Sequence, residues 1–154
     1  MNEVVEGAKN GHYIDSLLDP EQQMGLRDGF REVIYSSSMW RNSERGAEKI
    51  AAWLLTYGSP KDGCVGYTLV SERRPGSRKY EIELYMVGVR KDCQGRGHGR
   101  KIVQFFVASS PSTLKLYARC YPNSQAMFFL LQEIGFVLVS TTHQGIRELA
   151  LCRK

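Results

Sequence analysis

The sequence predicts a mixed α/β domain with helices on both faces of one central sheet. Two observations favour this class. The spacing of apolar residues changes from three or four in residues 24–55 to about two after Cys64. From there on, strand-like and helix-like segments alternate along the chain. The 154 residues contain no internal repeat or linker, so we expect a single domain covering residues 1–154.

The N-terminal third is expected to form a short strand and two helices. Residues 3–6 favour the strand. Asp19-Pro20 suits the cap and first position of a helix whose apolar stripe continues to Tyr35. A second helix should follow Asn42-Ser43-Glu44, because apolar residues repeat there at three and four until the breaker Gly58-Ser59-Pro60.

The rest of the chain is predicted as β-β-α-β-α-β-β. Alternating residues before and after the turn Arg74-Pro75-Gly76-Ser77 indicate a hairpin. Gly135 is the residue type usual just after a helix, so it should end the last helix. The expected strands are 64–70, 80–89, 113–121, 136–141 and 146–151, and the expected helices are 98–109 and 123–134.

The composition is that of a globular protein, with 42% apolar residues. No apolar run reaches eighteen residues and the N-terminus lacks the apolar core of a secretory signal, so we expect a cytoplasmic protein with no membrane contact. The four cysteines form no Cys-x-x-Cys pair, which argues against a metal site. A net charge of +5 suits an anionic cofactor or a nucleic acid, but equally no special partner.

A glycine-rich loop lies between the strand 80–89 and the helix that starts near His98. It contains Gly95, Gly97 and Gly99, interleaved with basic residues. The first N–H groups of a helix lack partners and carry roughly half a positive charge, and glycine lets a phosphate approach them closely. The spacing fits neither the dinucleotide fingerprint nor the Walker A loop. The sequence therefore predicts a phosphate or diphosphate site of another kind.

Residues Gln94-Gly95-Arg96-Gly97-His98-Gly99 match the pattern Gln/Arg-x-x-Gly-x-Gly/Ala, and the segment from Asn123 to Gly135-Phe136 has Asn-x-x-Ala followed by Gly-Phe. In these motifs and in its order of elements, the chain resembles the GCN5-related N-acetyltransferase (GNAT) superfamily. The resemblance covers residues 62–141 firmly and the N-terminal region loosely. It implies a mostly antiparallel sheet of six or seven strands.

The resemblance implies acetyl-CoA as the cofactor. Backbone groups of Val87 and Val89 would pair with the pantetheine arm, Gly88 suits a bulge in that strand, and Asn123 would contact the arm from the next helix. The loop would hold the pyrophosphate through Gln94, Gly95, Arg96, Gly97, His98, Gly99 and Arg100.

Acyl transfer to an amine needs a base, because an ammonium has no lone pair. Glu83 is the candidate base, since it occupies the strand position at which histone-acetyltransferase-like members carry theirs. Glu81 lies on the same face and could share this task or bind a positive substrate, although both could equally be solvent-facing strand carboxylates. A backbone N–H near Val87 or Gly88 could stabilise the tetrahedral oxyanion.

The general acid is where the chain departs from the family pattern. A tyrosine normally stands about four residues before the terminal Gly-Phe, but Leu131 occupies that place and residues 123–136 contain no tyrosine. Tyr121 is the candidate replacement, and Tyr117, Cys120 and Ser124 remain alternatives. A thiolate can also leave unaided, because the pKa of a simple thiol is only about 8.5.

The leading hypothesis is an acetyl-CoA-dependent N-acetyltransferase that acts on a primary amine of a small molecule, peptide or protein. An aminoacyl-tRNA acetylating toxin is a subclass of it that fits the small, basic chain. The missing tyrosine favours a rival, a non-catalytic acyl-CoA sensor or scaffold. A nucleic-acid-binding domain that uses the basic residues 73–79 is a third reading. The sequence also leaves a homodimer open.

Overall fold

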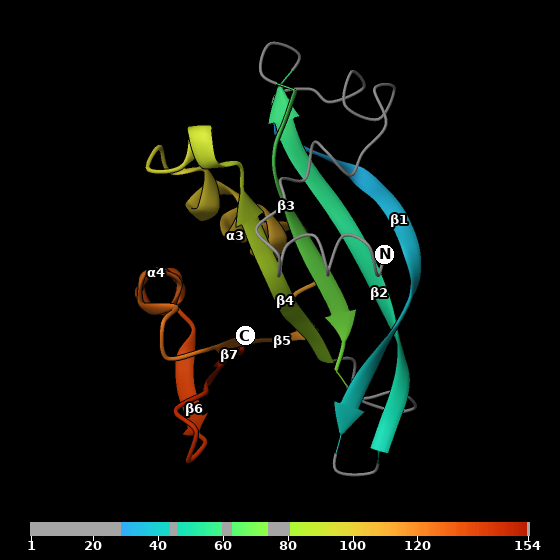
Figure 1. The fold of residues 1–154 in the computed structure, drawn as a ribbon, viewed down its shortest axis with the longest axis vertical. Helices are drawn as coiled ribbons and strands as arrows, with labels where there is room; N and C mark the ends of the chain where they lie inside the picture. The colour runs from blue at the N-terminus through green and yellow to red at the C-terminus, as the bar shows by residue number, and fades with distance from the viewer. Residues whose placement is uncertain (1–28, 44–45, 60–62, 74–80, 154) are drawn as a thin grey trace.

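The computed structural model describes residues 29–43, 46–59, 63–73 and 81–153, and its main feature is one seven-stranded sheet (Figure 1). The strands lie in the order β1-β2-β3-β4-β5-β7-β6. The predicted strand at 3–6 and the predicted helix start at Asp19 lie outside the described residues. The strands are β1 (Gly29–Ser43), β2 (Gly46–Ser59), β3 (Gly63–Glu72), β4 (Glu81–Val89), β5 (Lys115–Cys120), β6 (Val137–Thr141) and β7 (Arg147–Leu151). The helices are α3 (His98–Ser109), α4 (Gln125–Ile134) and the short 3-10 helix η2 (Lys91–Cys93).

All neighbouring strands pair antiparallel except β4 and β5, which pair parallel. A parallel pair cannot be joined by a tight turn, and α3 lies in the crossover between these two strands. The predicted β3–β4 hairpin is present, with Gly66 opposite Val89 and Glu72 opposite Ile82. The expected mostly antiparallel sheet of six or seven strands is therefore confirmed.

The two helices predicted before residue 60 are wrong wherever the structure describes them. β1 and β2 form a long antiparallel hairpin, and Gly46 beside its turn has a φ of +98°, which favours glycine. The run from Ile50 to Tyr57 is almost entirely apolar, and periodicity cannot distinguish a buried helix from a buried strand in such a run. Pairing of β2 with strands on both sides decides the matter.

Both described helices lie on the same face of the sheet (Figure 1). The expected second layer of helices is absent from the described part of the chain, because the segments predicted to form it are strands there. Neither α3 nor α4 is long and apolar enough to cross a membrane. The shared core contains Val103 and Phe106 of α3, Phe128 and Leu131 of α4, and Leu84, Leu116 and Leu149 of the sheet.

The core is densest where β5 passes under the two helices. Leu116, Leu131 and Leu149 have no exposed surface. Burial of one such leucine side chain contributes about 1.5–3 kcal/mol to the free energy of unfolding. This core therefore fixes β5 relative to α4 and sets the position of the residues that follow β5.

Both ends of α3 and the C-terminal end of α4 agree with the prediction, whereas α4 begins at Gln125 and not at Asn123. α3 covers residues 98–109, and Gly135, with a φ of +115°, ends α4. The Arg153 guanidinium donates hydrogen bonds to the carbonyl oxygens of Val107, Ser110 and Pro111 at 2.6, 2.8 and 2.5 Å. A cation at the C-terminal end of a helix is stabilising, so Arg153 anchors the end of α3 away from the glycine loop.

Candidate functional site

The parallel pair of β4 and β5 is closed at one end and open at the other. Pairing runs from Glu81 opposite Lys115 to Leu84 opposite Ala118, and no further. The register of β4 against β3 shifts between Leu84 and Met86, which leaves Tyr85 as an extra residue. Such a bulge bends a strand and ends its pairing. Beyond Leu84, β4 therefore continues along β3 without β5.

The main-chain groups of Val87 and Val89 point into this opening. Just after β4, the N–H of Arg90 donates to Val65 O at 2.8 Å, so its main-chain groups face β3. This orientation alternates along an antiparallel strand, which turns the N–H and C=O groups of Val87 and Val89 away from β3. The side-chain amide of Gln94 reaches Val89 O at 3.0 Å and ties the glycine loop to this end of β4.

The bulge lies at Tyr85 and not at Gly88, where the sequence suggested it. Gly88 has a different reason to be glycine: it lies opposite Tyr67, whose ring would be 2.1 Å from an added Cβ. The Tyr67 hydroxyl donates to the Met86 Sδ at 3.1 Å, and burial raises the pKa of Tyr67 to about 12. The Tyr67 ring therefore covers the main chain of β4 on its β3 side.

The glycine loop presents an uncapped helix start. Gly95 and Gly97 have φ values of +75° and +82°, in the left-handed region that glycine adopts without strain. Gly97 is the N-cap of α3, with no side-chain hydrogen bond to the cap and no acidic residue in the first turn. A Cβ added at Gly95, Gly97 or Gly99 would meet nothing within 4 Å. The space beside these N–H groups is open to a ligand.

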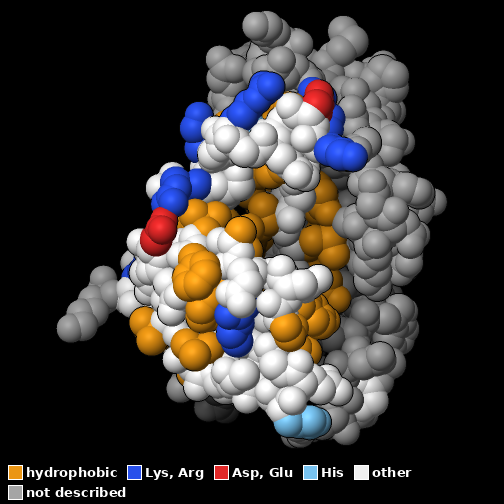
Figure 2. Space-filling view, turned by 60° about the vertical axis from the view of Figure 1, so that its left-hand side comes forward, with side chains coloured by type: hydrophobic (Ala, Val, Ile, Leu, Met, Phe, Trp, Pro, Cys, Tyr) orange, Lys and Arg blue, Asp and Glu red, His pale blue; other side chains and the backbone are white. Residues whose placement is uncertain are grey.

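A cavity of about 590 Å³ lies between this loop and the start of α4. The space-filling view shows hydrophobic side chains in the hollow of this face and Lys and Arg side chains above it (Figure 2). Predicted cofactor residues that line it are Val89, Gln94, Gly95, Gly97, His98, Gly99, Arg100 and Asn123. Val87, Gly88 and Arg96 do not line it.

Several lining residues were missed at the level of sequence, namely Cys93, Ala126, Met127 and Leu130, whereas Ser124 was considered only as a candidate acid. Most of them share one face of α4, because residues 123, 126, 127 and 130 follow the helical spacing of three and four. That spacing was a signal that could have extended the predicted site from Asn123 to the apolar wall.

The basic residues of the loop differ in their surroundings. Arg96 and Lys101 are exposed, whereas Arg100 pairs with Glu133 of α4. The His98 ring packs against the Tyr57 ring, with centroids 5.5 Å apart. Arg90, at the end of β4, hydrogen-bonds Asp92 at 2.6 Å and lowers the pKa of that carboxyl. Arg96, Arg100 and Lys101 are thus all exposed at the loop, and of the three Arg100 is held in an ion pair with Glu133.

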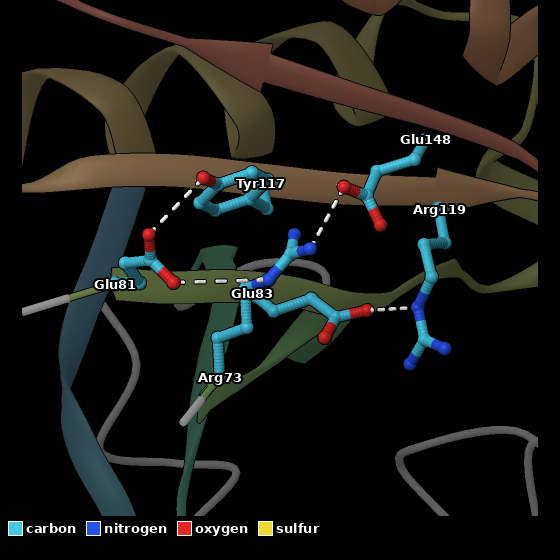
Figure 3. Close-up of polar contacts among 6 residues, drawn as sticks. All are labelled: Arg73, Glu81, Glu83, Tyr117, Arg119 and Glu148. Carbon is cyan, nitrogen blue, oxygen red and sulfur yellow. Dashed lines mark hydrogen bonds and ion pairs between the residues drawn. The ribbon is translucent and has the colours of Figure 1, made fainter. Parts of the chain in front are cut away.

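The face of the sheet opposite α3 and α4 carries a polar network (Figure 3). The Tyr117 hydroxyl donates to Glu81 Oε1 at 3.1 Å. Arg73 pairs with Glu148 at 2.7 Å and with Glu81 at 3.9 Å, and its guanidinium carbon lies 3.6 Å from the Tyr117 ring centroid. These contacts link the residue after β3 with β4, β5 and β7.

Glu83, the predicted base, belongs to the same face but has a separate partner. Only 2% of its surface is exposed, and Arg119 Nε lies 2.6 Å from Glu83 Oε1. The interpretation of Glu83 as a solvent-facing strand carboxylate is therefore wrong. Burial alone would lower the pKa of Arg119, but the charge and hydrogen bond of Glu83 outweigh it and raise that pKa overall.

The candidate acids occupy four different surroundings. Tyr121 follows β5 and is 62% exposed, and it does not line the cavity. Tyr117 is buried on the opposite face and donates to Glu81. Cys120 is buried among core residues, and burial raises the pKa of its thiol. Ser124 alone of the four lines the cavity.

Leu131, which stands where the family pattern has tyrosine, is fully buried in the core. A side chain at this position points away from the cavity, whereas the neighbouring Leu130 lines it. Within the described ranges, no group of three His, Cys, Asp or Glu residues could hold a metal ion.

The match to a family model agrees with this arrangement. The model of the acetyltransferase (GNAT) family matches residues 14–136, which is most of the chain. The chain belongs to the acetyltransferase (GNAT) family. The family predicted from the glycine loop and the Asn123–Phe136 segment is thereby confirmed, and with it the acetyltransferase class. No curated protein matches the sequence.

Solved GNAT-type structures share the fold at low identity. An IAA acetyltransferase from Bacillus cereus aligns with a TM-score of 0.51 at 19% identity over 66% of this chain and 77% of its own. A spermidine N-acetyltransferase from Vibrio cholerae, in complex with CoA and spermine, gives 0.53 at 14% identity over 66% of each chain. An N-acetyltransferase from Staphylococcus aureus gives 0.51 at 13% identity over 64% and 69%. The chain thus spans about two thirds to three quarters of their lengths.

Proposed function

We propose that residues 1–154 form a single domain that transfers an acetyl group from acetyl-CoA to a primary amine in a ternary complex. The observation that carries this proposal is the uncapped start of α3 beside a cavity at the opened β4–β5 pair. A helix start favours a diphosphate, and an opened pair offers main-chain groups to an amide-bearing arm. The acceptor is an amine of a small molecule, peptide or protein.

The cofactor would extend from the loop along β4. Main-chain N–H groups of residues 95–100 would hold the diphosphate, with Arg96 and Lys101 adding positive charge. The pantetheine amides would pair with the main chain of Val87 and Val89, and Asn123, Met127 and Leu130 would form the opposite wall. This placement brings the thioester to the point where β4 and β5 part.

The chemistry then needs a deprotonated amine. Glu83 lies on β4 just before the bulge, so we assign it the role of base, directly or through a water molecule. The amine nitrogen bonds to the thioester carbonyl carbon, and a main-chain N–H near Val87 or Gly88 stabilises the oxyanion. The C–S bond breaks, and the surplus proton on the nitrogen passes to the thiolate, either through Tyr121 or Ser124 or after the thiolate has left unaided.

A second candidate function has one specific observation in its favour. Leu131 is buried where the family pattern has tyrosine, which fits a domain that binds acyl-CoA without turning it over. The nucleic-acid reading gains no such support. Of the basic residues 73–79 only Arg73 is described, and its partly buried guanidinium contacts Tyr117 and Glu148.

Free-thiol release from acetyl-CoA, measured across a panel of amines, tests the proposal. Glu83→Gln should lower kcat about 10²- to 10⁴-fold with unchanged binding of CoA. Glu81→Gln is the matched control, because Glu81 lies on the same strand and face but is tied to Tyr117. Equal activity of Glu83→Gln and the parent would remove Glu83 as the base. Tight CoA binding without thiol release on any amine would favour the sensor.

A further inference from the structure

Arg119 occupies a special position at the opening between β4 and β5. Ala118 is the last β5 residue that pairs with β4, so Arg119 is the first one beyond the closed segment. Its side chain lies on the same face as Glu83 and reaches back to it, with 2.6 Å between Nε and Oε1 (Figure 3). The ion pair therefore spans the point where the two strands part.

The two members of this pair differ in exposure. The Glu83 side chain is 2% exposed, whereas the Arg119 side chain is 35% exposed. An isolated buried carboxylate is strongly disfavoured in its charged form unless a cation or hydrogen-bond donors compensate it. The planar guanidinium supplies both at once, because it carries a permanent charge and directs N–H groups at the carboxylate.

The second arginine of this face, Arg73, provides a contrast. Its guanidinium contacts Glu81 and the Tyr117 ring, which belong to the closed segment, and Glu148 of β7, which lies opposite Arg119. Arg73 therefore ties neighbouring strands together. Arg119 instead follows Ala118, the last β5 residue that pairs with β4, at the end of the pair where the thioester is expected.

We propose that Arg119 is a positioning residue that keeps the Glu83 carboxylate charged and fixed in orientation at the point where β4 and β5 part. This inference rests on the proposed acetyl transfer. There, one proton moves from the acceptor ammonium to Glu83, and the amine nitrogen bonds to the carbonyl carbon. The C–S bond breaks, and the second N–H proton neutralises the departing thiolate. Without the guanidinium, the buried carboxylate would lose the charge and the N–H donors that favour its ionised form.

The test compares Arg119→Gln and Arg119→Lys by the pH profile of kcat/KM in the thiol-release assay. Within the described ranges, other charged or titratable groups near this pair are Arg73 just after β3, Glu81 and Tyr85 from β4, Lys115 and Tyr117 from β5, Glu148 from β7 and Tyr121 beyond β5. Because Arg119→Gln leaves those in place, it should move the acidic limb of the profile upward by about 1 to 3 pH units. Arg119→Lys keeps a positive charge at this position, so its acidic limb should lie close to that of the parent.

Arg73→Gln is the matched control, since it removes an equal charge from the same face at a side chain that pairs with Glu81 and Glu148. It should lower stability without moving the acidic limb. A uniform loss of activity at every pH in Arg119→Gln, with the acidic limb unmoved, would overturn the proposal and leave Arg119 a structural residue.

A second measurement does not depend on turnover. In protein labelled with ¹³C at the glutamate carboxyl carbon, the Glu83 signal is assigned by its loss in Glu83→Gln and followed against pH. In Arg119→Gln that signal should titrate about 1 to 3 units higher than in the parent. Identical titration in both proteins would refute the inference. If the parent binds CoA but acetylates no amine, the proposed function fails while this readout still decides the role of Arg119.

Discussion

The two ends of the β4–β5 pair are built in different ways. At the closed end, residues 81–84 of β4 are bonded to β5, and the Tyr117 hydroxyl of β5 donates to Glu81 of β4. At the open end, Tyr85 breaks the register, and the main-chain groups of Val87 and Val89 face a gap beside the cavity. The closed end holds the sheet together, and the open end leaves backbone hydrogen-bonding groups for a ligand.

This difference shows how a sheet can bind a ligand without losing its stability. Unpaired main-chain groups are costly when buried, so a permanent gap within a sheet needs strong pairing nearby. Here the closed end lies directly over the core leucines, while the open end is lined by a loop and one face of α4. We expect substitutions at the two ends to separate stability from cofactor binding.

The largest effect should come from the closed end. Leu116→Ala removes a fully buried side chain from the middle of the core, which should lower the free energy of unfolding by about 2–5 kcal/mol. The control Leu138→Ala, on the exposed outer strand β6, should change it by less than about 0.5 kcal/mol. Urea denaturation measures both. Similar values for the two variants would mean that the core does not lie at the closed end.

The next effect concerns pH and the open end. Burial raises the pKa of Tyr67 to about 12, whereas an unfolded tyrosine titrates near pH 10. Below pH 10 both states hold the proton; above it the unfolded chain loses its proton first, so stability falls until the folded pKa is passed. Between pH 9 and pH 11 this loss is about 1.4 kcal/mol.

Tyr67→Phe should lack this part of the fall in the free energy of unfolding between pH 9 and pH 11. The control Tyr121→Phe, at an exposed tyrosine, should keep it. Urea denaturation at pH 9 and pH 11 measures both differences. An unchanged loss in Tyr67→Phe would show that the ring over Gly88 is open to hydroxide and that the open end is looser than described.

The smallest effect should appear in cofactor affinity alone. Gly99 lies in the first turn of α3, and an added Cβ meets nothing. Gly99→Asp puts a negative charge there, which favours the helix by about 0.3–1 kcal/mol. The same charge repels a diphosphate by about 1 kcal/mol at 4 Å in water, so CoA should bind about fivefold more weakly.

Gly99→Asn has nearly the same shape without the charge, so it isolates the electrostatic part. Isothermal calorimetry with CoA and thermal unfolding measure the two quantities. Equal affinities in the Asp and Asn variants would place the diphosphate away from the start of α3.

Prediction from the sequence succeeded where local signals were strong. The start of α3 at His98 and the end of α4 at Gly135 follow from glycine placement, and the β3–β4 hairpin follows from alternation between turn residues. It failed in residues 29–59, because an apolar run without a clear period fits a helix and a strand equally well. Strand partners far along the chain decided that choice.

The candidate site divides in the same way. The glycine loop and Asn123 were predicted because both motifs are contiguous, and they line one cavity. The bulge at Tyr85 and the pairing of Glu83 with Arg119 could not be predicted, since both depend on the register between strands. A shift of one residue would turn these side chains to the other face.

The sequence by itself determined the helix ends, the uncapped glycine loop and the family, because each depends on residues close together in the chain. Tertiary structure alone decided that residues 29–59 are strands, that β4 leaves β5 after Leu84, and that Glu83 is buried against Arg119. These features arise from contacts between distant segments, whose free energies no local pattern records.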